Sequence, residues 1–413
     1  MTEATVTIIG GGLSGFQVAA TLRELAFPGR IVLVGDEPHA PYHRPPLSKA
    51  YLLEEMDQGR LDLRPAAFYA DRHIELLTGR RAVAIDRTHR KVALDDDSVI
   101  EYQHLVLAVG ARNRPLPVPG ADLDGVSFLR SLDEASVLRL RLGTAKQAIV
   151  IGAGFIGLEF AAAARKAGVD VTVIEVADRP MARALSAEMA QIFTREHTRT
   201  GVHFKFNTQV MRITGAGGRV TGVETVEGEM IPADLIVIGI GVIPNVELAA
   251  TCNLEVRNGI VVDDRLLTAD PNISAIGDCA AHPTCYAEQI VRLESVQNAT
   301  DQGRYVAGRI AGRPAAFSAV PWFWSDQGKL KLQIAGLLIG HERVVVRGDL
   351  ASDSCAVFCF RGGRLIAVET VNRPGDHLAA RRLIGGGIAL TPEQAADEKV
   401  SLKQLAAAAA PAS

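Results

Sequence analysis

The sequence has few cysteines, and none of them is spaced for redox or metal chemistry. Its 413 residues include five cysteines, at positions 252, 279, 285, 355 and 359, with no CxxC pair and no metal-ligand spacing. The ten histidines likewise form no HxxxH pattern. A disulfide framework or a zinc site would need such spacing. We therefore expect five ordinary thiols and no metal site.

Long apolar runs are also missing. The most apolar stretch, AIVIGAGFIGLEFAAAA (148–164), is interrupted by three glycines and by Glu159, whereas a membrane-spanning helix needs about 20 apolar residues. The first residues, MTEATVTIIGGG, lack the basic and apolar regions of a signal peptide. These features predict a cytoplasmic protein without a membrane partner.

Neither sign of charge dominates. With 44 Lys and Arg against 47 Asp and Glu, the formal net charge is −3, which argues against non-specific binding to nucleic acid. The composition, 48% hydrophobic and 22% charged, is that of a globular protein. The length predicts two or three domains.

Two segments of the chain share one nucleotide-binding pattern. Each has an apolar strand, a GxGxxG turn, a helix of small residues, and a second strand that ends near an acid. The glycines allow a tight turn, a close approach of the backbone to a pyrophosphate, and close packing of helix on strand, while the acid accepts hydrogen bonds from a ribose. The residues concerned are Gly10, Gly12, Leu13, Gly15 and Asp36 in the first segment, and Gly152, Gly154, Ile156, Gly157 and Glu175 in the second. The chain is therefore predicted to bind two dinucleotides.

The later part of the chain changes from parallel-type to antiparallel-type patterns. A strand ends at Asp278 in ISAIGDCA, and a helical pattern follows from about residue 295 to 311. Beyond residue 320, short strands and a Gly362-Gly363 pair predict an antiparallel sheet with a hairpin turn. PGDHLAARRLIGGG (374–387) predicts a helix, and the tail from 405 to 413 is expected to be frayed.

A proline-rich stretch, PYHRPPLSK (41–49), follows the first segment. Each proline fixes its own φ and restricts the residue before it, which excludes an ordinary helix. We expect a stiff, extended segment that presents Lys49.

The two fingerprints, together with RPPLSK (44–49), GAGFIGLEFA (152–161) and PWFWSDQ (321–327), resemble a known family over nearly the whole chain. The family is that of FAD-dependent, NADH-linked ferredoxin reductases of bacterial oxygenase systems, the putidaredoxin-reductase-like flavoproteins of glutathione reductase fold. The resemblance implies an α/β fold with two Rossmann-like dinucleotide-binding domains (FAD, NAD) and a C-terminal α+β domain with an antiparallel sheet. The implied domains are FAD-binding (1–115 and 242–319), NAD-binding (116–241) and C-terminal (320–413).

The function implied by the resemblance is electron transfer. FAD would take hydride from NADH and pass single electrons to an acidic 2Fe–2S ferredoxin that serves a cytochrome P-450 monooxygenase or an aromatic-ring dioxygenase. Disulfide reductases of this fold carry a CxxxxC pair where this chain has PYHRPPLSK, so no internal dithiol relay is expected. An NADH oxidase or peroxidase and an apoptosis-inducing-factor-like NADH oxidoreductase remain open alternatives, as do a monomer and a dimer.

The resemblance also implies roles for single residues. Lys49 would pair with Glu159 and stabilise negative charge on the reduced flavin, which makes these two the predicted catalytic residues. Asp278 would bind the ribityl chain of FAD. Trp324 would lie near the flavin, whereas Trp322 is expected to be core. The remaining implied contacts are Arg44, Val83, Arg130 and Val296 for FAD, and Arg183 and Gly241 for NAD.

Two expectations concern specificity. The Glu175 carboxylate would repel a 2′-phosphate and so favour NADH, although Arg179 and Arg183 could attract that phosphate. An acidic ferredoxin would need a local basic patch. The candidate residues for this patch are Arg64, Arg72, Arg304, Arg309, Lys329 and Lys331.

Overall fold

The computed structural model describes residues 4–313 and 316–408, and its contacts divide the chain into two compact units. Unit 1 comprises Met1–His43, Gly59–Arg112 and Ile243–Pro321, and unit 2 comprises Arg44–Gln58, Asn113–Val242 and Trp322–Ser413. One boundary therefore falls inside the proline-rich stretch. The three-domain division expected from the sequence stays a prediction.

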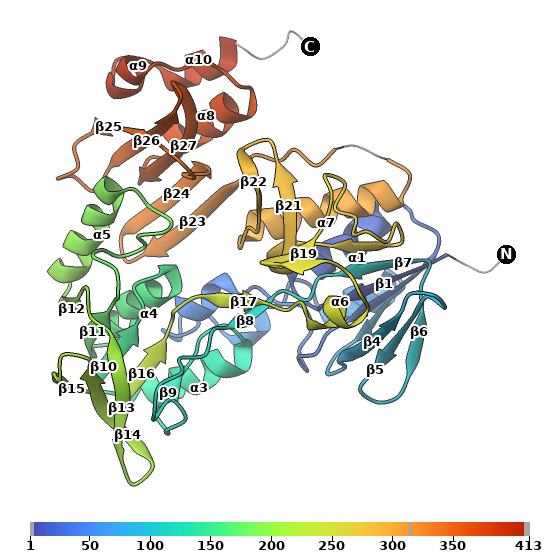
Figure 1. Cartoon of the computed structure of the whole chain (residues 1–413), viewed down its shortest axis with the longest axis horizontal. Helices are drawn as coiled ribbons and strands as arrows, with labels where there is room; N and C mark the ends of the chain where they lie inside the picture. Colours follow the sequence, from blue (N-terminus) through green and yellow to red (C-terminus); the bar gives the residue numbers. More distant parts are fainter. Residues whose placement is uncertain (1–3, 314–315, 409–413) are drawn as a thin grey trace. The chain divides into compact units, whose positions relative to one another are not determined.

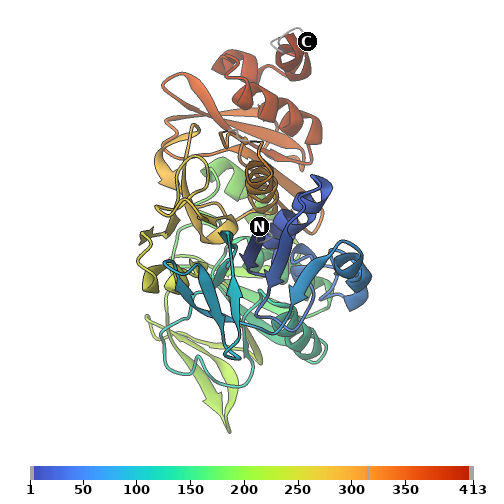
Figure 2. The same ribbon diagram turned by 90° about the vertical axis from the view of Figure 1, so that its right-hand side faces the viewer.

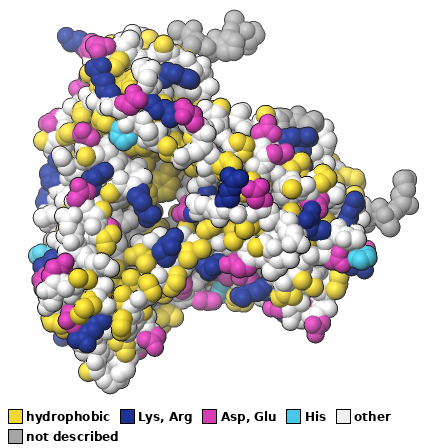
Figure 3. Space-filling view, viewed as in Figure 1, with side chains coloured by type: hydrophobic (Ala, Val, Ile, Leu, Met, Phe, Trp, Pro, Cys, Tyr) yellow, Lys and Arg dark blue, Asp and Glu magenta, His cyan; other side chains and the backbone are white. Residues whose placement is uncertain are grey.

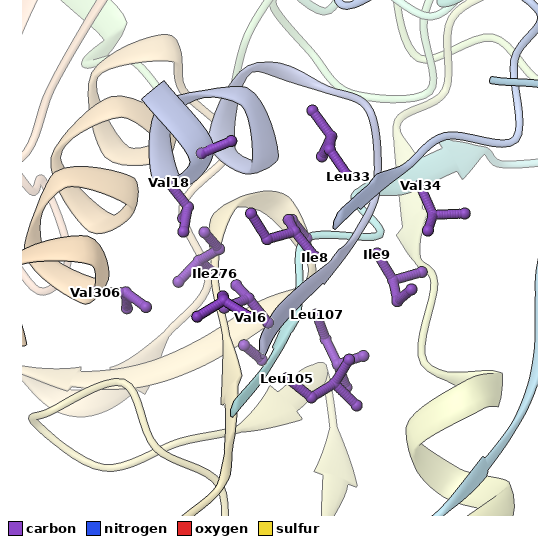
Figure 4. Packing of buried hydrophobic residues seen from close by; sticks show 14 of the residues in the cluster. Val6, Ile8, Ile9, Val18, Leu33, Val34, Leu105, Leu107, Ile276 and Val306 are labelled. Carbon is purple, nitrogen blue, oxygen red and sulfur yellow. The ribbon is translucent and has the colours of Figure 1, made fainter. Parts of the chain in front are cut away.

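Unit 1 is built on a five-stranded parallel sheet in the order β20-β7-β1-β2-β3. Helices α1 and α7 pack against each other beside it. Apolar side chains of β1, α1 and α7, among them Ile8, Val18 and Val306, meet in the core (Figure 4). The elements are β1 (Thr5–Ile9), β2 (Arg30–Val34), β3 (Ile74–Leu77), β7 (His104–Leu107), β20 (Ile273–Ala275), α1 (Leu13–Glu24) and α7 (Val296–Ile310). Most residues of these strands are apolar, because a covered parallel sheet is buried on both faces.

Smaller elements complete unit 1. A three-stranded antiparallel sheet consists of β4 (Ala82–Asp86), β5 (Lys91–Leu94) and β6 (Val99–Glu101). A four-stranded sheet consists of β18 (Val256–Arg257), β19 (Gly259–Val261), β21 (Ala280–Thr284) and β22 (Ala287–Val291). The short helices are α2 (Ala66–Asp71), α6 (Glu247–Thr251) and the 3₁₀ turn η3 (Gly277–Cys279). Where the chain passes between the units it forms the 3₁₀ turn η2 (Gln58–Arg60) and the strands β8 (Ala111–Asn113) and β17 (Val242–Pro244).

Unit 2 contains a second five-stranded parallel sheet, in the order β12-β11-β10-β16-β9. Its elements are β9 (Val126–Ser127), β10 (Gln147–Ile151), β11 (Asp170–Ile174), β12 (Val202–Lys205), β16 (Leu235–Ile238), α3 (Leu132–Leu142), α4 (Phe155–Lys166) and α5 (Ala187–Arg199). A separate antiparallel sheet consists of β13 (Val210–Ala216), β14 (Arg219–Thr225) and β15 (Met230–Pro232). The β13–β14 hairpin projects from this part (Figure 1).

The C-terminal part of unit 2 is a five-stranded antiparallel sheet in the order β23-β24-β27-β26-β25. Helices α8 and α9 pack on this sheet and α10 packs on α8 (Figures 1 and 2). The elements are β23 (Trp322–Gln327), β24 (Leu330–Gly336), β25 (Arg343–Gly348), β26 (Cys355–Arg361), β27 (Arg364–Val371), α8 (Pro374–Gly385), α9 (Pro392–Ala396) and α10 (Leu402–Ala408). The predicted fold class, with two parallel sheets and a C-terminal antiparallel sheet, is confirmed.

Several local predictions are also confirmed. Gly362 and Gly363 have φ values of +53° and +75° and join β26 to β27 in the predicted hairpin, a turn that requires positive φ at both positions. Helices α7 and α8 form where the sequence predicted them. All five cysteines are free thiols.

Two local predictions were wrong. The segment Pro45–Ser48 forms a 3₁₀ turn, η1, and is not extended, because a proline at the first position of a turn supplies the required φ without losing a hydrogen bond. The tail is helical as far as Ala408 in α10, and residues 409–413 lie outside the described residues.

Candidate active site

The first glycine fingerprint, in unit 1, leaves its backbone exposed to a ligand. Gly10 has a φ of +122°, and a β-carbon there would lie 2.1 Å from the carbonyl oxygen of Ala108. A β-carbon on Gly15 would lie 2.1 Å from the carbonyl oxygen of Gly10. A β-carbon on Gly12 would meet no atom of the described residues within 4 Å. The turn is therefore closed to side chains on the protein side and open on the other.

The helices that follow the two fingerprints begin without a side-chain cap. Among the described residues, no side chain caps α1 after Gly12 or α4 after Gly154, and neither helix has an acid in its first turn. Leu13 is the first residue of α1, and Ile156 is the second of α4. The N–H groups of an uncapped first turn attract a phosphate. Both turns therefore fit the pyrophosphate of a dinucleotide.

The second fingerprint, in unit 2, repeats the first and is linked to its acid. A β-carbon on Gly157 would lie 2.4 Å from the carbonyl oxygen of Gly152. The carboxylate of Glu175 accepts hydrogen bonds from the backbone N–H of Ala153 at 2.7 Å and of Ala177 at 2.9 Å. Each carboxylate oxygen has further lone pairs. Glu175 is thus held beside the turn and can still accept from a ribose.

The corresponding acids of unit 1 lie at the end of β2. Asp36 is exposed, with one oxygen 4.0 Å from the guanidinium of Arg81. The next residue, Glu37, accepts a hydrogen bond of 2.6 Å from the hydroxyl of Tyr42. The exposed Asp36 therefore fits the predicted ribose contact.

The turn that carries Asp278 lies next to the start of α1. Gly277 has a φ of +73°, and a β-carbon there would lie 2.8 Å from Oγ of Ser14. The backbone N–H of Gly277 donates to Oε1 of Gln302 on α7 at 2.7 Å. Asp278 and the first fingerprint are therefore neighbours. Val296 begins α7 in the same unit, whereas Val83 lies exposed on the separate β4–β6 sheet.

The predicted pair of Lys49 and Glu159 is present in unit 2. Nζ of Lys49 lies 2.9 Å from Oε1 of Glu159, and the side chains are 24% and 4% exposed, respectively. The same carboxylate accepts hydrogen bonds from Oγ of Ser48 at 2.5 Å and from Oγ of Ser325 at 2.6 Å. A buried carboxylate is tolerated when it is paired and fully hydrogen-bonded. The role of the pair in catalysis stays a prediction.

The segment that carries Lys49 is anchored on both sides within unit 2. Tyr51 is buried, its hydroxyl lies 2.8 Å from Oγ of Ser136 on α3, and the guanidinium of Arg139 lies 4.4 Å from its ring centre. Glu55 forms an ion pair of 2.5 Å with Lys166 at the end of α4. Lys49 is therefore held between α3 and α4.

Arg44 and Arg130, both predicted FAD contacts, are brought together at the start of this segment. Nη1 of Arg44 donates to the carbonyl oxygen of Arg130 at 2.8 Å. The backbone N–H of Arg130 donates to Oε2 of Glu134 in the first turn of α3 at 2.8 Å.

Strand β23 presents different side chains on its two faces. Phe323 packs on Phe155 of α4 with ring centres 4.5 Å apart, on the same face as Ser325. On the other face, the rings of Trp322 and Trp324 lie 5.5 Å apart. Trp322 is only partly buried, under the guanidinium of Arg381 at 4.8 Å. The core alternative for Trp322 stays a prediction, as does the contact of Trp324 with the flavin.

The predicted NAD contacts near Glu175 differ in their surroundings. Arg179 forms an ion pair of 3.0 Å with Asp178 and donates to the carbonyl oxygen of Ala182 at 3.4 Å. Arg183 is exposed, and its Nη2 lies 3.6 Å from the position of a β-carbon on Gly241. The structure therefore brings Arg183 and Gly241 together, while Asp178 offsets the charge of Arg179.

Two candidates for the basic patch do not fit it. Arg309 is partly buried and donates to Oγ of Ser274 at 2.5 Å. Lys329 is paired with Asp353 and lies 3.3 Å from Glu196. Arg64, Arg72, Arg304 and Lys331 are exposed. On the face shown in Figure 3, basic and acidic side chains are interspersed.

Residues 4–313 and 316–408 contain neither a membrane-spanning helix nor a metal-binding cluster. No helix there is long and apolar enough to cross a membrane. In the same part of the chain, no cluster of three His, Cys, Asp or Glu side chains could hold a metal ion.

Sequence reasoning missed the side chains that surround Glu159. Ser48 was adjacent to a predicted residue, and the alternation of β23 would place Ser325 and Gln327 on one face. No sequence signal connects either serine with Glu159, which lies 111 residues from Ser48 and 166 from Ser325.

Comparison with known proteins covers nearly the whole chain. The family described as "Pyridine nucleotide-disulphide oxidoreductase" matches residues 4–303, and that described as "Reductase C-terminal" matches residues 322–406. Rhodocoxin reductase of Rhodococcus erythropolis is 54% identical over 399 residues, which cover 97% of this chain and 93% of that protein. Putidaredoxin reductase CamA of Pseudomonas putida is 40% identical over 409 residues, covering 98% and 97%.

Solved structures agree with these relatives. The ferredoxin reductase for the CYP199A2 system from Rhodopseudomonas palustris matches with a TM-score of 0.95 at 50% identity, over 97% of this chain and 99% of that one. The covalent putidaredoxin reductase–putidaredoxin complex matches with a TM-score of 0.96 at 40% identity, over 99% of each chain. The chain therefore belongs to the pyridine nucleotide-disulphide oxidoreductase family and, within it, to the putidaredoxin-reductase-like ferredoxin reductases that its motifs predicted.

Proposed function

We propose that this protein is an FAD-containing, NADH-dependent ferredoxin reductase. It takes hydride from NADH and passes single electrons to a 2Fe–2S ferredoxin, which serves a cytochrome P-450 monooxygenase or an aromatic-ring dioxygenase. The observation that carries the proposal is the ion pair of Lys49 with the buried Glu159 beside the second fingerprint, in a chain without a cysteine before Cys252. The ammonium group of Lys49, fixed by Glu159, can stabilise a reduced flavin, so electron transfer needs no cysteine pair in this chain. The cytoplasmic location stays a prediction.

The residues of each unit fit one dinucleotide. In unit 1, the turn of Gly10, Gly12 and Gly15 is open to a pyrophosphate, while Asp36 follows β2 and Asp278 lies in η3 after β20. In unit 2, the turn of the second fingerprint and Glu175 offer the same arrangement to NADH. We assign FAD to the first and NADH to the second, following the family.

We assign a separate role in electron transfer to FAD and to each of the side chains around Lys49. Bound FAD supplies the change from two-electron to one-electron transfer. Lys49 supplies a fixed positive charge where negative charge develops on reduction. Glu159 holds that charge in place, since a lysine at 24% exposure is costly without a partner. Ser48 and Ser325 hold the carboxylate in turn.

The partner is a small 2Fe–2S ferredoxin. The solved complex of putidaredoxin reductase with putidaredoxin and the names of the relatives support this assignment. We propose that the ferredoxin of this protein is acidic, because attraction between opposite charges raises association rates between redox partners.

Steady-state oxidation of NADH tests the proposal. Purified protein reconstituted with FAD should oxidise NADH slowly in air and many times faster when a 2Fe–2S ferredoxin is added. Ferricyanide serves as the control acceptor, since it needs no protein docking. Rapid turnover with oxygen or peroxide, unchanged by ferredoxin, would favour an oxidase or peroxidase instead.

A further inference from the structure

One carboxylate oxygen of Glu159 is shared between two donors of different kinds. Oε1 lies 2.9 Å from Nζ of Lys49 and 2.6 Å from Oγ of Ser325, whereas Oε2 accepts from Ser48. The strength with which Oε1 holds Lys49 therefore depends on whether Ser325 also donates to it. A hydroxyl has a single proton to donate. The hydrogen bond from Ser325 to Glu159 therefore depends on the second side chain that contacts Oγ of Ser325.

That neighbour is the buried side chain of Gln327. Its Nε2 lies 3.1 Å from Oγ of Ser325 and 3.7 Å from Sδ of Met181, and its Oε1 lies 2.8 Å from Nε2 of His197. A thioether sulfur only accepts, so the amino group of Gln327 faces Met181 and Ser325. The amide oxygen consequently faces His197, which must donate.

The hydrogen bonds therefore run in one direction, from His197 to Gln327, to Ser325 and to Glu159. His197 is 3% exposed, and burial holds the pKa of its imidazole below the ordinary value, against the opposing effects of Gln327 and Glu196. A neutral imidazole has one N–H, and the contact with Gln327 assigns it to Nε2. Hydrogen bonds aligned in this way polarise one another.

We propose that His197, through Gln327 and Ser325, is a positioning group that sets how tightly Glu159 holds Lys49, and thereby tunes the bound flavin. The inference rests on the proposed function. Without the N–H of His197, the amide oxygen of Gln327 loses its donor, and the less polarised amide donates more weakly to Ser325. The hydroxyl of Ser325 then donates more weakly to Oε1 of Glu159, Oε1 attracts Lys49 more strongly, and less of the lysine charge acts on the flavin.

The first test measures the direction of the chain and does not depend on flavin. Protein with ¹⁵N-labelled histidine is examined by NMR near neutral pH, and the His197 signal is assigned by its loss in His197→Gln. We expect a neutral ring protonated at Nε2. A proton on Nδ1, or a charged ring at pH 7, would overturn the proposal.

The second test measures the midpoint potential of FAD in the reconstituted enzyme. His197→Phe and Ser325→Ala should each lower the equilibrium constant for flavin reduction three- to tenfold, a shift of about 14–30 mV for two electrons. The double variant should shift no further than the larger single effect, because both changes break one chain. In His197→Gln the new amide N–H can donate to Gln327 in place of the imidazole N–H, so the midpoint potential should stay at the wild-type value.

A matched control separates positioning from packing. Phe193 is buried on the same helix, α5, and has no polar atom to contribute. Phe193→Leu should lower the melting temperature and leave the potential unchanged. An equal shift in Phe193→Leu, or an unchanged potential in His197→Phe, would contradict the proposal. If His197→Phe does not fold, Gln327→Leu tests the same link.

The two tests also separate this inference from the proposed function. Failure to bind FAD would refute the function, while the NMR result would still report the state of His197. A normal ferredoxin reductase with the wrong histidine tautomer would refute only the inference.

Discussion

Lys49 and Glu159 place opposite charges in a site that is largely closed to water. Removing one partner leaves the other unpaired, which for a buried pair costs about 3–5 kcal/mol. Since Lys49 is 24% exposed, we expect Lys49→Ala to lower the free energy of unfolding by about 3 kcal/mol, at the lower end of that range. It should also make the flavin harder to reduce. Urea unfolding and spectroelectrochemistry measure the two effects.

The pair is best tested by a double-mutant cycle. The effects of Lys49→Ala and Glu159→Ala on the flavin potential should not add in the double variant, because they remove one interaction. Lys49→Arg keeps the charge and serves as the control. Strictly additive shifts would mean that the two side chains act independently.

Glu369 on β27 is a second buried carboxylate, and it forms no ion pair with a Lys or Arg of residues 4–313 and 316–408. It is fully buried and accepts hydrogen bonds from the backbone N–H and the hydroxyl of Ser186, the residue that caps α5. Burial raises the pKa of Glu369 to about 7, against the lowering effect of the Ser186 hydrogen bonds.

This raised pKa predicts a pH-dependent stability. Below pH 4.5 the carboxyl is protonated in both states; as the pH rises toward 7, the unfolded chain ionises first and stability falls. The loss amounts to as much as about 3 kcal/mol, at about 1.4 kcal/mol per pKa unit. Glu369→Gln should remove this component, so its stability relative to wild type should rise between pH 4.5 and 7. Urea unfolding across that range measures it, and a constant difference between the two proteins would refute the assignment.

Glu175 carries the prediction on nicotinamide choice. Its carboxylate is fixed by Ala153 and Ala177 beside the second turn, and Asp178 offsets Arg179. We expect kcat/KM for NADH to exceed that for NADPH at least tenfold. Glu175→Gln should lower this NADH-to-NADPH ratio. Adding Asp178→Asn, which removes the partner of Arg179, should lower the ratio further. Stopped-flow reduction by each nucleotide measures the ratio, and equal values for wild type would refute the argument.

At the scale of elements, the sequence predicted those structures whose cause is local. The GxGxxG turns, the hairpin at Gly362-Gly363 and helix α7 all depend on residues close together in the chain. The 3₁₀ turn at Pro45–Ser48 was missed, because proline φ values suit a tight turn as well as an extended chain.

The surroundings of Glu159 could not be predicted in the same way. The alternation of β23 indicates that Ser325 and Gln327 share a face, but not that α4 and α5 pack there. His197 lies 130 residues from Gln327, and only the packing of separate elements joins them. Of the side chains around Glu159, the family resemblance predicted only Lys49.

Helix α2 and its flanking residues offer a testable docking element. Arg64 and Arg72 lie 5.7 Å and 5.8 Å from the ring centre of Phe68, so one aromatic ring holds two exposed cations. Reversing both charges should slow association with an acidic ferredoxin several-fold at low salt and flatten its salt dependence. Ferricyanide turnover should not change.

A control for that experiment is available in the same unit. Arg30 is paired with Glu75 at 2.6 Å, so Arg30→Gln removes a cation that is already offset. It should leave the ferredoxin rate close to that of wild type. A similar loss in both variants would indicate a general charge effect and not a docking element.

At the scale of the whole molecule, relatives and solved structures extend over both units. Matches of 97% to 99% of the chain mean that the C-terminal sheet and its helices belong to the conserved architecture of these proteins.

Neither unit is continuous in the sequence, and this has a consequence for synthesis on the ribosome. Leu105 of strand β7 is made 168 residues before Ile273 of β20 (Ile273–Ala275), its partner at the edge of the sheet. The nascent chain therefore exposes an unpaired strand edge for about two-fifths of the synthesis of its 413 residues. Lys49 is likewise made long before Glu159, its ion-pair partner, and Glu159 before Ser325, which donates a hydrogen bond to it. FAD can therefore be captured only late, and a chain stalled before residue 273 would be a natural client for a chaperone.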